Sequence, residues 1–157
     1  MSAQTNQLEI LKTCLERLRN KEIDQAATCL AANATWKYTT ASYRKEKYEG
    51  GFDEIVAQVN KEEAGCDLRK EELVVAWKKY FDDPFSDPQT LTVRDIEHTK
   101  DAIACRVIVD LVNMDGKEQR KEFHLVAEID EKKGKIVRVI DFVDQERYEQ
   151  VKRFTSS

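Results

Sequence analysis

The sequence predicts an α+β domain, with helices in the N-terminal half and an antiparallel sheet in the C-terminal half. In the first half, apolar residues recur every three or four positions, which is the spacing of a helix with one buried face. After residue 90, apolar and β-branched residues alternate with polar ones in four long segments. Short turns join these segments, and two of the turns contain glycine, as is typical of antiparallel neighbours.

The N-terminal helices are defined by their apolar stripes. The helix expected over residues 4–19 has an apolar stripe formed by Leu8, Leu11, Leu15 and Leu18. Asn20 can cap the start of a second helix that follows at once. Gly50-Gly51 then breaks the chain before a third helix over residues 52–62, whose apolar face is Phe52, Ile55, Val56 and Val59.

Residues 70–81 fit two structures. The apolar run 73–77 could form a strand on its own, but a charged opposite face favours a helix, with Glu71, Glu72, Lys78 and Lys79. Asp-Pro pairs at 83–84 and 87–88 predict a loop after this segment, because the residue before proline avoids helical geometry. A helical tail is expected over residues 145–154.

The strands are indicated by period-two alternation. Residues 34–40 form the first, with Trp36 and Tyr38 on one face, and residues 43–49 could add a short edge strand or hairpin arm. The later strands are expected at 90–98, 102–113, 121–130 and 135–144. Asp115-Gly116 is a hairpin signal, and Gly134 supplies a positive φ angle in the last turn.

Length and charge exclude several classes of protein. The 157 residues suit a single domain, 1–157, and the net charge of −4 comes from interleaved signs without a basic stripe. We therefore expect no nucleic-acid partner. The apolar runs are too short to cross a bilayer, and the N-terminus has no secretory signal, so no membrane association and a cytoplasmic location are expected.

Cofactor and metal motifs are missing from the sequence. The four cysteines are widely spaced, which predicts reduced thiols without a metal site. Glycine-rich phosphate loops and nucleophile elbows are likewise absent from the sequence. We expect a protein that needs no cofactor.

Three segments resemble the nuclear transport factor 2-like superfamily, particularly its SnoaL-like branch. They are Leu30-Ala-Ala-Asn-Ala-Thr-Trp36, Tyr48-Glu-Gly-Gly-Phe-Asp-Glu-Ile-Val56 and Gly134-Lys-Ile-Val-Arg-Val-Ile-Asp-Phe-Val-Asp144. The resemblance implies a cone in which a curved antiparallel sheet wraps around the N-terminal helices and leaves a pocket at its open end. Residues 63–88 depart from the pattern as a longer insertion that could cover the pocket mouth. The superfamily contains both enzymes and interaction modules, so the fold alone does not define the function.

Asp141 is the first candidate site residue. It shares one face of the last strand with Val137, Val139 and Val143, so a cavity on that side would hold a lone carboxylate in apolar surroundings. Desolvation would raise its pKa toward neutrality, as a general acid or base requires. The resemblance to SnoaL-like cyclases also implies a catalytic acid here. In the alternative, Asp141 is solvated or pairs with Arg106 or Arg138.

Aromatic residues are the other candidates. Tyr38 could donate a hydrogen bond to a carbonyl or developing enolate, and the expected pocket comprises Trp36, Tyr38, Trp77, Val139 and Asp141. Alternatively, these aromatic side chains only pack in the core. The two histidines, His98 and His124, are predicted in a turn and on the outer face, so neither fits a pocket base.

The outer face of strand 102–113 is half apolar, whereas a solvated sheet face should be mostly polar. We therefore predict a homodimer through Arg106, Ile108, Asp110, Val112, His124 and Val126. The alternative is that the 63–88 insertion or the tail covers this face.

Two functions remain open on sequence grounds. One is a pocket protein for a small apolar ligand, with Asp141 as a catalytic acid or base in a cofactor-free isomerase, dehydratase or cyclase. The other is a non-catalytic, homodimeric interaction or scaffold module.

Overall fold

The computed structural model describes residues 3–44, 50–62, 65–81, 87–99, 101–112 and 115–155. The order of elements is α1 (Ala3–Arg19), α2 (Ile23–Ala27), β1 (Leu30–Thr39), α3 (Phe52–Glu62), β2 (Cys66–Arg69), α4 (Lys70–Phe81), β3 (Asp87–His98), β4 (Ile103–Val112), β5 (Glu118–Asp130), β6 (Lys135–Phe142) and α5 (Gln145–Thr155). None of these helices is long and apolar enough to cross a bilayer.

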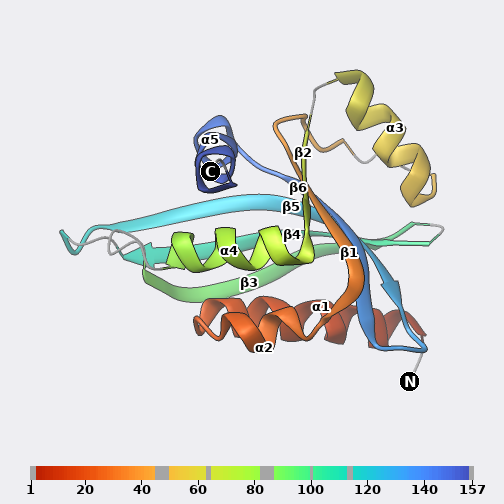
Figure 1. Cartoon of the computed structure of the whole chain (residues 1–157), viewed down its shortest axis with the longest axis horizontal. Coiled ribbons are helices and arrows are strands. Elements are labelled where there is room, and N and C mark those ends of the chain that lie inside the picture. The colour runs from red at the N-terminus through yellow and green to blue at the C-terminus, as the bar shows by residue number, and fades with distance from the viewer. Residues whose placement is uncertain are drawn as a thin grey trace.

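The described strands form one sheet in the order β2-β1-β6-β5-β4-β3. Neighbours pair antiparallel except β1 and β6, which run parallel and place Trp36 beside Val139 and Tyr38 beside Asp141. The sheet is strongly bent: β3, β4 and β5 extend along the long axis, while β1 and β6 curve away from them (Figure 1). This confirms the predicted α+β fold with a curved sheet, and adds one parallel pair.

The two faces of the sheet belong to two hydrophobic cores. The larger core lies on the concave side, where α1, α2, α4 and α5 pack against residues such as Trp36, Cys105, Leu125 and Val139. The smaller core lies on the opposite face, where α3 covers Ala104, Val126, Ile140 and Phe142. Because side chains alternate along each strand, successive residues face opposite cores.

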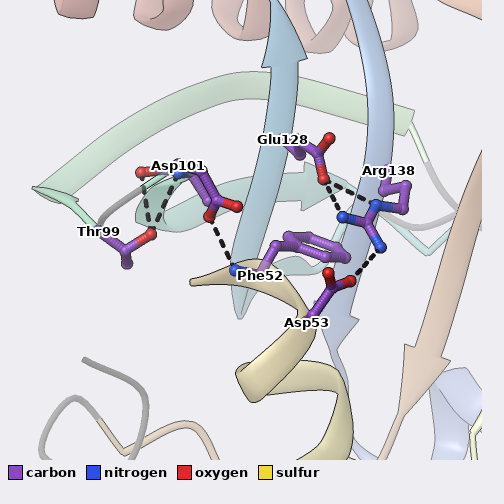
Figure 2. Close-up of polar contacts among 7 residues, drawn as sticks. Phe52, Asp53, Thr99, Asp101, Glu128 and Arg138 are labelled. Carbon is purple, nitrogen blue, oxygen red and sulfur yellow. Dashed lines mark hydrogen bonds and ion pairs between the residues drawn. The ribbon is translucent and has the colours of Figure 1, made fainter. Parts of the chain in front are cut away.

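Helix α3 is fixed to the outer face by polar contacts at its first turn (Figure 2). Asp101 Oδ1 accepts a hydrogen bond from the Phe52 backbone N–H at 2.8 Å, which satisfies one of the free amides at the helix start. Arg138 reaches across from β6 to pair with Asp53 at 2.7 Å and with Glu128, and its guanidinium lies 4.4 Å from the centre of the Phe52 ring.

Most predicted elements are confirmed, and α3 and α4 have the expected bounds. Sequence analysis missed β2, a four-residue edge strand that pairs antiparallel with β1. The second helix begins at Ile23, and Asn20 does not cap it. Asp87-Pro88 begins β3 instead of forming a loop. Residues 45–49 and 83–84, where an edge strand and a loop were expected, lie outside the described residues.

The predicted turns have the expected backbone geometry. Gly116 and Gly134 have φ angles of 76° and 65°, the left-handed region that favours glycine. An irregularity between Glu128 and Ile129 shifts the β5–β6 register, so Ile136 rather than Val137 enters the inner core. Beyond this irregularity the side chains of β6 alternate as predicted, so Val139 faces the inner core and Ile140 faces the outer core.

Candidate functional site

A cavity of about 310 Å³ opens on the concave side of the sheet. Its floor comes from β1, β3, β4, β5 and β6, and its walls come from α1, α4 and the first turns of α5. The lining is mainly apolar and aromatic, with Leu15, Leu18, Trp36, Tyr38, Trp77, Tyr80, Leu91, Val109, Leu111, Phe123 and Val143 among its residues. Asp141 and Arg147 are among the polar groups at this apolar wall.

Asp141 lies on the cavity floor and is 5% exposed. Trp36 Nε1 donates a hydrogen bond to its Oδ2 atom at 3.1 Å. Oδ1 is buried and has no hydrogen-bond partner among the residues that the structure describes. Burial raises the pKa of the Asp141 carboxyl to about 7, and the Trp36 hydrogen bond and the Arg147 charge only partly oppose this rise.

Arg147 is one of three basic residues that line the cavity, with Arg19 and Lys121, and it lies on α5. Asp144 caps this helix, because its Oδ1 atom accepts a hydrogen bond from the Arg147 backbone N–H at 2.8 Å. The guanidinium stacks on the Tyr80 ring, 4.0 Å from its centre, and lies 5.6 Å from that of Tyr38. Its Nη1 atom is buried without a hydrogen-bond partner within the described ranges.

Tyr38 is buried beside these two groups, 1% exposed. Burial raises the pKa of its phenol above the usual range. The Arg147 charge opposes that shift, the nearby Asp141 adds to it, and hydrogen bonding with Trp77 and Arg147 opposes it. Tyr38 therefore stays a neutral hydroxyl. Trp36 connects the aromatic groups, 5.4 Å from Trp77 in an edge-to-face contact.

Asp141 Oδ1 and Arg147 Nη1 are two unsatisfied polar atoms at one apolar cavity. A buried polar group without a partner is costly, so such atoms mark the places where a ligand would supply the missing hydrogen bonds. A group held half-protonated near neutral pH can both take and return a proton, and a buried guanidinium can stabilise a developing oxyanion.

The structure gathers most of the predicted pocket. Trp36, Tyr38, Trp77 and Asp141 all line the cavity, whereas Val139 is buried in the same core without lining it. Asp141 pairs with neither Arg106 nor Arg138, which form surface ion pairs with Asp95 and Asp53. Sequence analysis missed Arg147. The sequence identifies Asp144 as a cap for the predicted helical tail. It does not show that packing turns Arg147, the first arginine of that helix, toward the cavity.

The predicted dimer face is partly covered by its own chain. Val126 is fully buried under α3, and His124 stacks on Tyr43 at 4.6 Å between ring centres. The other predicted interface residues lie farther along β4, where Arg106 and Asp110 pair with Glu122 and Arg120. Among the described residues, α3 and Tyr43 supply this cover. Residues 65–81 of that insertion form β2 and α4, which extend the sheet and wall the cavity.

Solved structures share this fold at low sequence identity. A candidate isomerase from Bacillus subtilis is 14% identical, with a TM-score of 0.63 over 90% of this chain and 88% of that one. A candidate polyketide cyclase from Xanthomonas campestris is 13% identical, with a TM-score of 0.58 over 96% of this chain and 99% of that one. A nuclear transport factor 2-like protein of unknown function from Burkholderia pseudomallei is also 13% identical, with a TM-score of 0.58 over 100% of both chains.

These likenesses define the class of fold. No protein-family model and no curated protein sequence matches the chain. The chain nevertheless has the nuclear transport factor 2-like fold, as the three sequence segments indicated. In this chain the cavity that Asp141 and Arg147 line lies on the helix-packed inner side of the sheet.

Proposed function

We propose that this protein binds a small, mainly apolar carbonyl compound and catalyses a cofactor-free proton transfer on it, with Asp141 as the acid–base group. The observation that carries the proposal is the asymmetric carboxylate. One oxygen of Asp141 is held by Trp36, and the other is buried at the cavity without a protein partner among the described residues.

The chemistry follows from the charges at the cavity. The unprotonated Asp141 accepts a proton from carbon next to the ligand carbonyl, and an enolate forms. The Arg147 guanidinium balances the negative charge on the enolate oxygen, with Tyr38 as a second donor. Asp141 then returns the proton at another position, which yields an isomer, or to a leaving hydroxyl, which yields a dehydrated product.

The size and lining of the cavity support a small ligand. Its volume of about 310 Å³ lies at the lower end of the ~300–1,000 Å³ typical of ligand sites. The aromatic rings around Asp141 offer apolar contact on several sides. Two proteins of the same fold, described as a candidate isomerase and a candidate cyclase, are compatible with this chemistry.

The scaffold alternative finds less support. A cavity plugged by Trp36, Tyr38 and Phe142 would favour the scaffold, but Phe142 packs in the outer core under α3. The cavity stays open beside Asp141, and α3 already covers part of the sheet face that a partner would use.

Deuterium exchange tests the proposal before any substrate is known. A panel of cyclic 1,3-diketones and unsaturated ketones is incubated with the protein in D₂O, and NMR follows loss of the protons next to the carbonyl. We expect exchange above the buffer rate for a compound that also raises the melting temperature. The same exchange rate with Asp141→Asn as with the unchanged protein would contradict the role of Asp141.

A further inference from the structure

A second polar cluster lies outside the cavity, where the end of α1 meets the start of β1. Cys29 follows α2, and its backbone is fixed on both sides, by the bond from its N–H to Ala26 O at 3.0 Å and by the bond from the Ile136 N–H at 2.8 Å. Its thiol borders a surface groove of about 320 Å³ that Arg17 and Lys135 also line. The groove is distinct from the Asp141 cavity, because no residue lines both.

Arg17 contacts the Cys29 sulfur directly. Its Nη1 atom lies 3.4 Å from Cys29 Sγ, and the same nitrogen donates to the Gln25 carbonyl at 3.0 Å and to Thr28 Oγ1 at 3.2 Å. These bonds fix the guanidinium against the sulfur. Lys135 adds a second cation and donates to the Thr28 carbonyl. Cations held against a sulfur favour the thiolate, which is the reactive form of cysteine.

Cys14 on α1 lies on the buried side of the same sulfur. Its thiol is fully buried and donates to the Ala26 carbonyl at 3.7 Å, the same carbonyl that accepts the Cys29 backbone N–H. Hydrogen bonding with Cys14 is the main cause that lowers the pKa of Cys29, to about 6, and the Arg17 and Lys135 charges act in the same direction against burial. The pKa of Cys14 is raised well above its usual value, mainly by the same bond.

We infer that Cys29 is a peroxide-reactive thiolate and that Cys14 is its resolving thiol, so that the pair forms a reversible disulfide. In the first step the Cys29 thiolate attacks one oxygen of hydrogen peroxide, which gives a sulfenic acid and hydroxide. In the second step Cys14 attacks the Cys29 sulfur, which forms the disulfide and releases water. Peroxide is the two-electron oxidant, and an external thiol restores both cysteines.

This site is separate from the proposed acid–base function. All four cysteines are free in the structure, so the reduced state is the one described. The disulfide would tie α1 to the start of β1. Because Leu15 and Leu18 of α1 line the Asp141 cavity, oxidation is expected to weaken ligand binding there.

Competition between cysteines of one molecule tests the inference without any variant. Cys66 is half-buried and more accessible than Cys29, but its pKa is raised, chiefly by burial and then by Asp67. Trypsin places each of the four cysteines in a separate peptide. With limiting iodoacetamide at pH 7, we expect Cys29 to be alkylated on the order of tenfold faster than Cys66. Faster labelling of Cys66 would overturn the inference.

Oxidation provides the second readout. After a few equivalents of hydrogen peroxide, non-reducing peptide mapping should show the Cys14 and Cys29 peptides linked, and dithiothreitol should separate them. Cys14→Ser should stop at the sulfenic acid, so that dimedone labels Cys29. Arg17→Gln should slow alkylation of Cys29, whereas Lys12→Gln, a matched charge change on the same helix, should not. Absence of the linked peptide in oxidised protein of unchanged circular dichroism would contradict the disulfide.

Discussion

Trp36 Nε1 donates a hydrogen bond of 3.1 Å to Asp141 Oδ2, across 105 residues of sequence. The bond holds one oxygen of the carboxylate, whereas the other is buried without a hydrogen-bond partner among the described residues. The bond also lowers the pKa of the Asp141 carboxyl, which burial raises, so the indole helps to keep that pKa at about 7. The hydrogen bond between β1 and β6 and the pKa of the carboxyl thus depend on the same pair of residues.

Asp141 makes stability depend on pH. Burial raises its pKa from 3.8 to about 7, so the folded state keeps a proton that the unfolded chain has lost over this range. The stabilising contribution is therefore full below pH 4 and is lost as pH rises through 7. At most, this pKa shift changes the free energy of unfolding by about 4 kcal/mol. Asp141→Asn should match the unchanged protein at low pH and exceed it by about 2–4 kcal/mol at pH 8.

Urea unfolding at several pH values checks this difference. Asp144→Asn is a suitable control, because Asp144 is exposed and asparagine also caps helices. A difference that changes with pH for Asp141→Asn and not for this control would assign the effect to the buried carboxyl. A pH-independent difference for Asp141→Asn would show that the buried carboxyl does not titrate in this range.

Trp36→Phe should raise the pKa of Asp141 above about 7, because it removes the hydrogen bond that favours the ionised carboxylate. Carbon-13 NMR of the Asp141 carboxyl reports the titration directly. The rate of proton exchange catalysed by the base form should show the same upward shift of its midpoint. Trp77→Phe is the control, since Trp77 hydrogen-bonds Tyr38, and a similar shift from both variants would contradict the specific bond.

Arg147→Met should weaken binding of a carbonyl ligand by roughly 10–100-fold. The variant removes the buried guanidinium, whose Nη1 atom has no partner among the described residues and would donate a hydrogen bond to the ligand. Binding is measured by calorimetry with a compound from the exchange panel. Arg153→Met, a change of the same kind on α5 outside the cavity lining, should leave affinity unchanged. Equal losses for the two variants would indicate a general effect of charge.

Phe52→Ala should destabilise the protein by about 3–5 kcal/mol, because the ring is 2% exposed and anchors α3 in the outer core. Val75→Ala, at an apolar side chain that is 49% exposed, should change stability by less than about 0.5 kcal/mol. Urea unfolding gives both values. A small effect of Phe52→Ala would mean that α3 is only loosely packed on the sheet (Figure 2).

Homodimerisation stays a prediction. On the sheet face beyond α3, Ile108 lies between the charged pairs of Arg106 and Asp110, and Val112 follows Asp110 at the end of β4. Sedimentation at micromolar concentration should show a dimer, and Val112→Lys, at the end of β4 on this surface, should shift it toward monomer. A monomer for the unchanged protein would leave α3 as the whole explanation of the apolar outer face.

The sequence predicted what alternation and spacing determine. The phase of β6 follows from strict alternation between Val139 and Phe142, so Asp141 could be assigned to the cavity side as one of two choices. The stripe of α3 showed that its apolar face is buried, but not which sheet face receives it. Both faces of β4 are apolar enough to accept a helix. Arg147 was missed because its direction depends on where α5 packs, and β2 because four residues carry little pattern.

The parallel pairing of β1 with β6 has a consequence for biosynthesis. Tyr38 on β1 and Leu125 on β5 both pair with Asp141 on β6, and β6 leaves the ribosome about a hundred residues after Tyr38. Until then, the apolar edge of β1 has no partner on that side and is open to mispairing with other nascent chains. Molecular chaperones that shield such edges should therefore matter most late in translation.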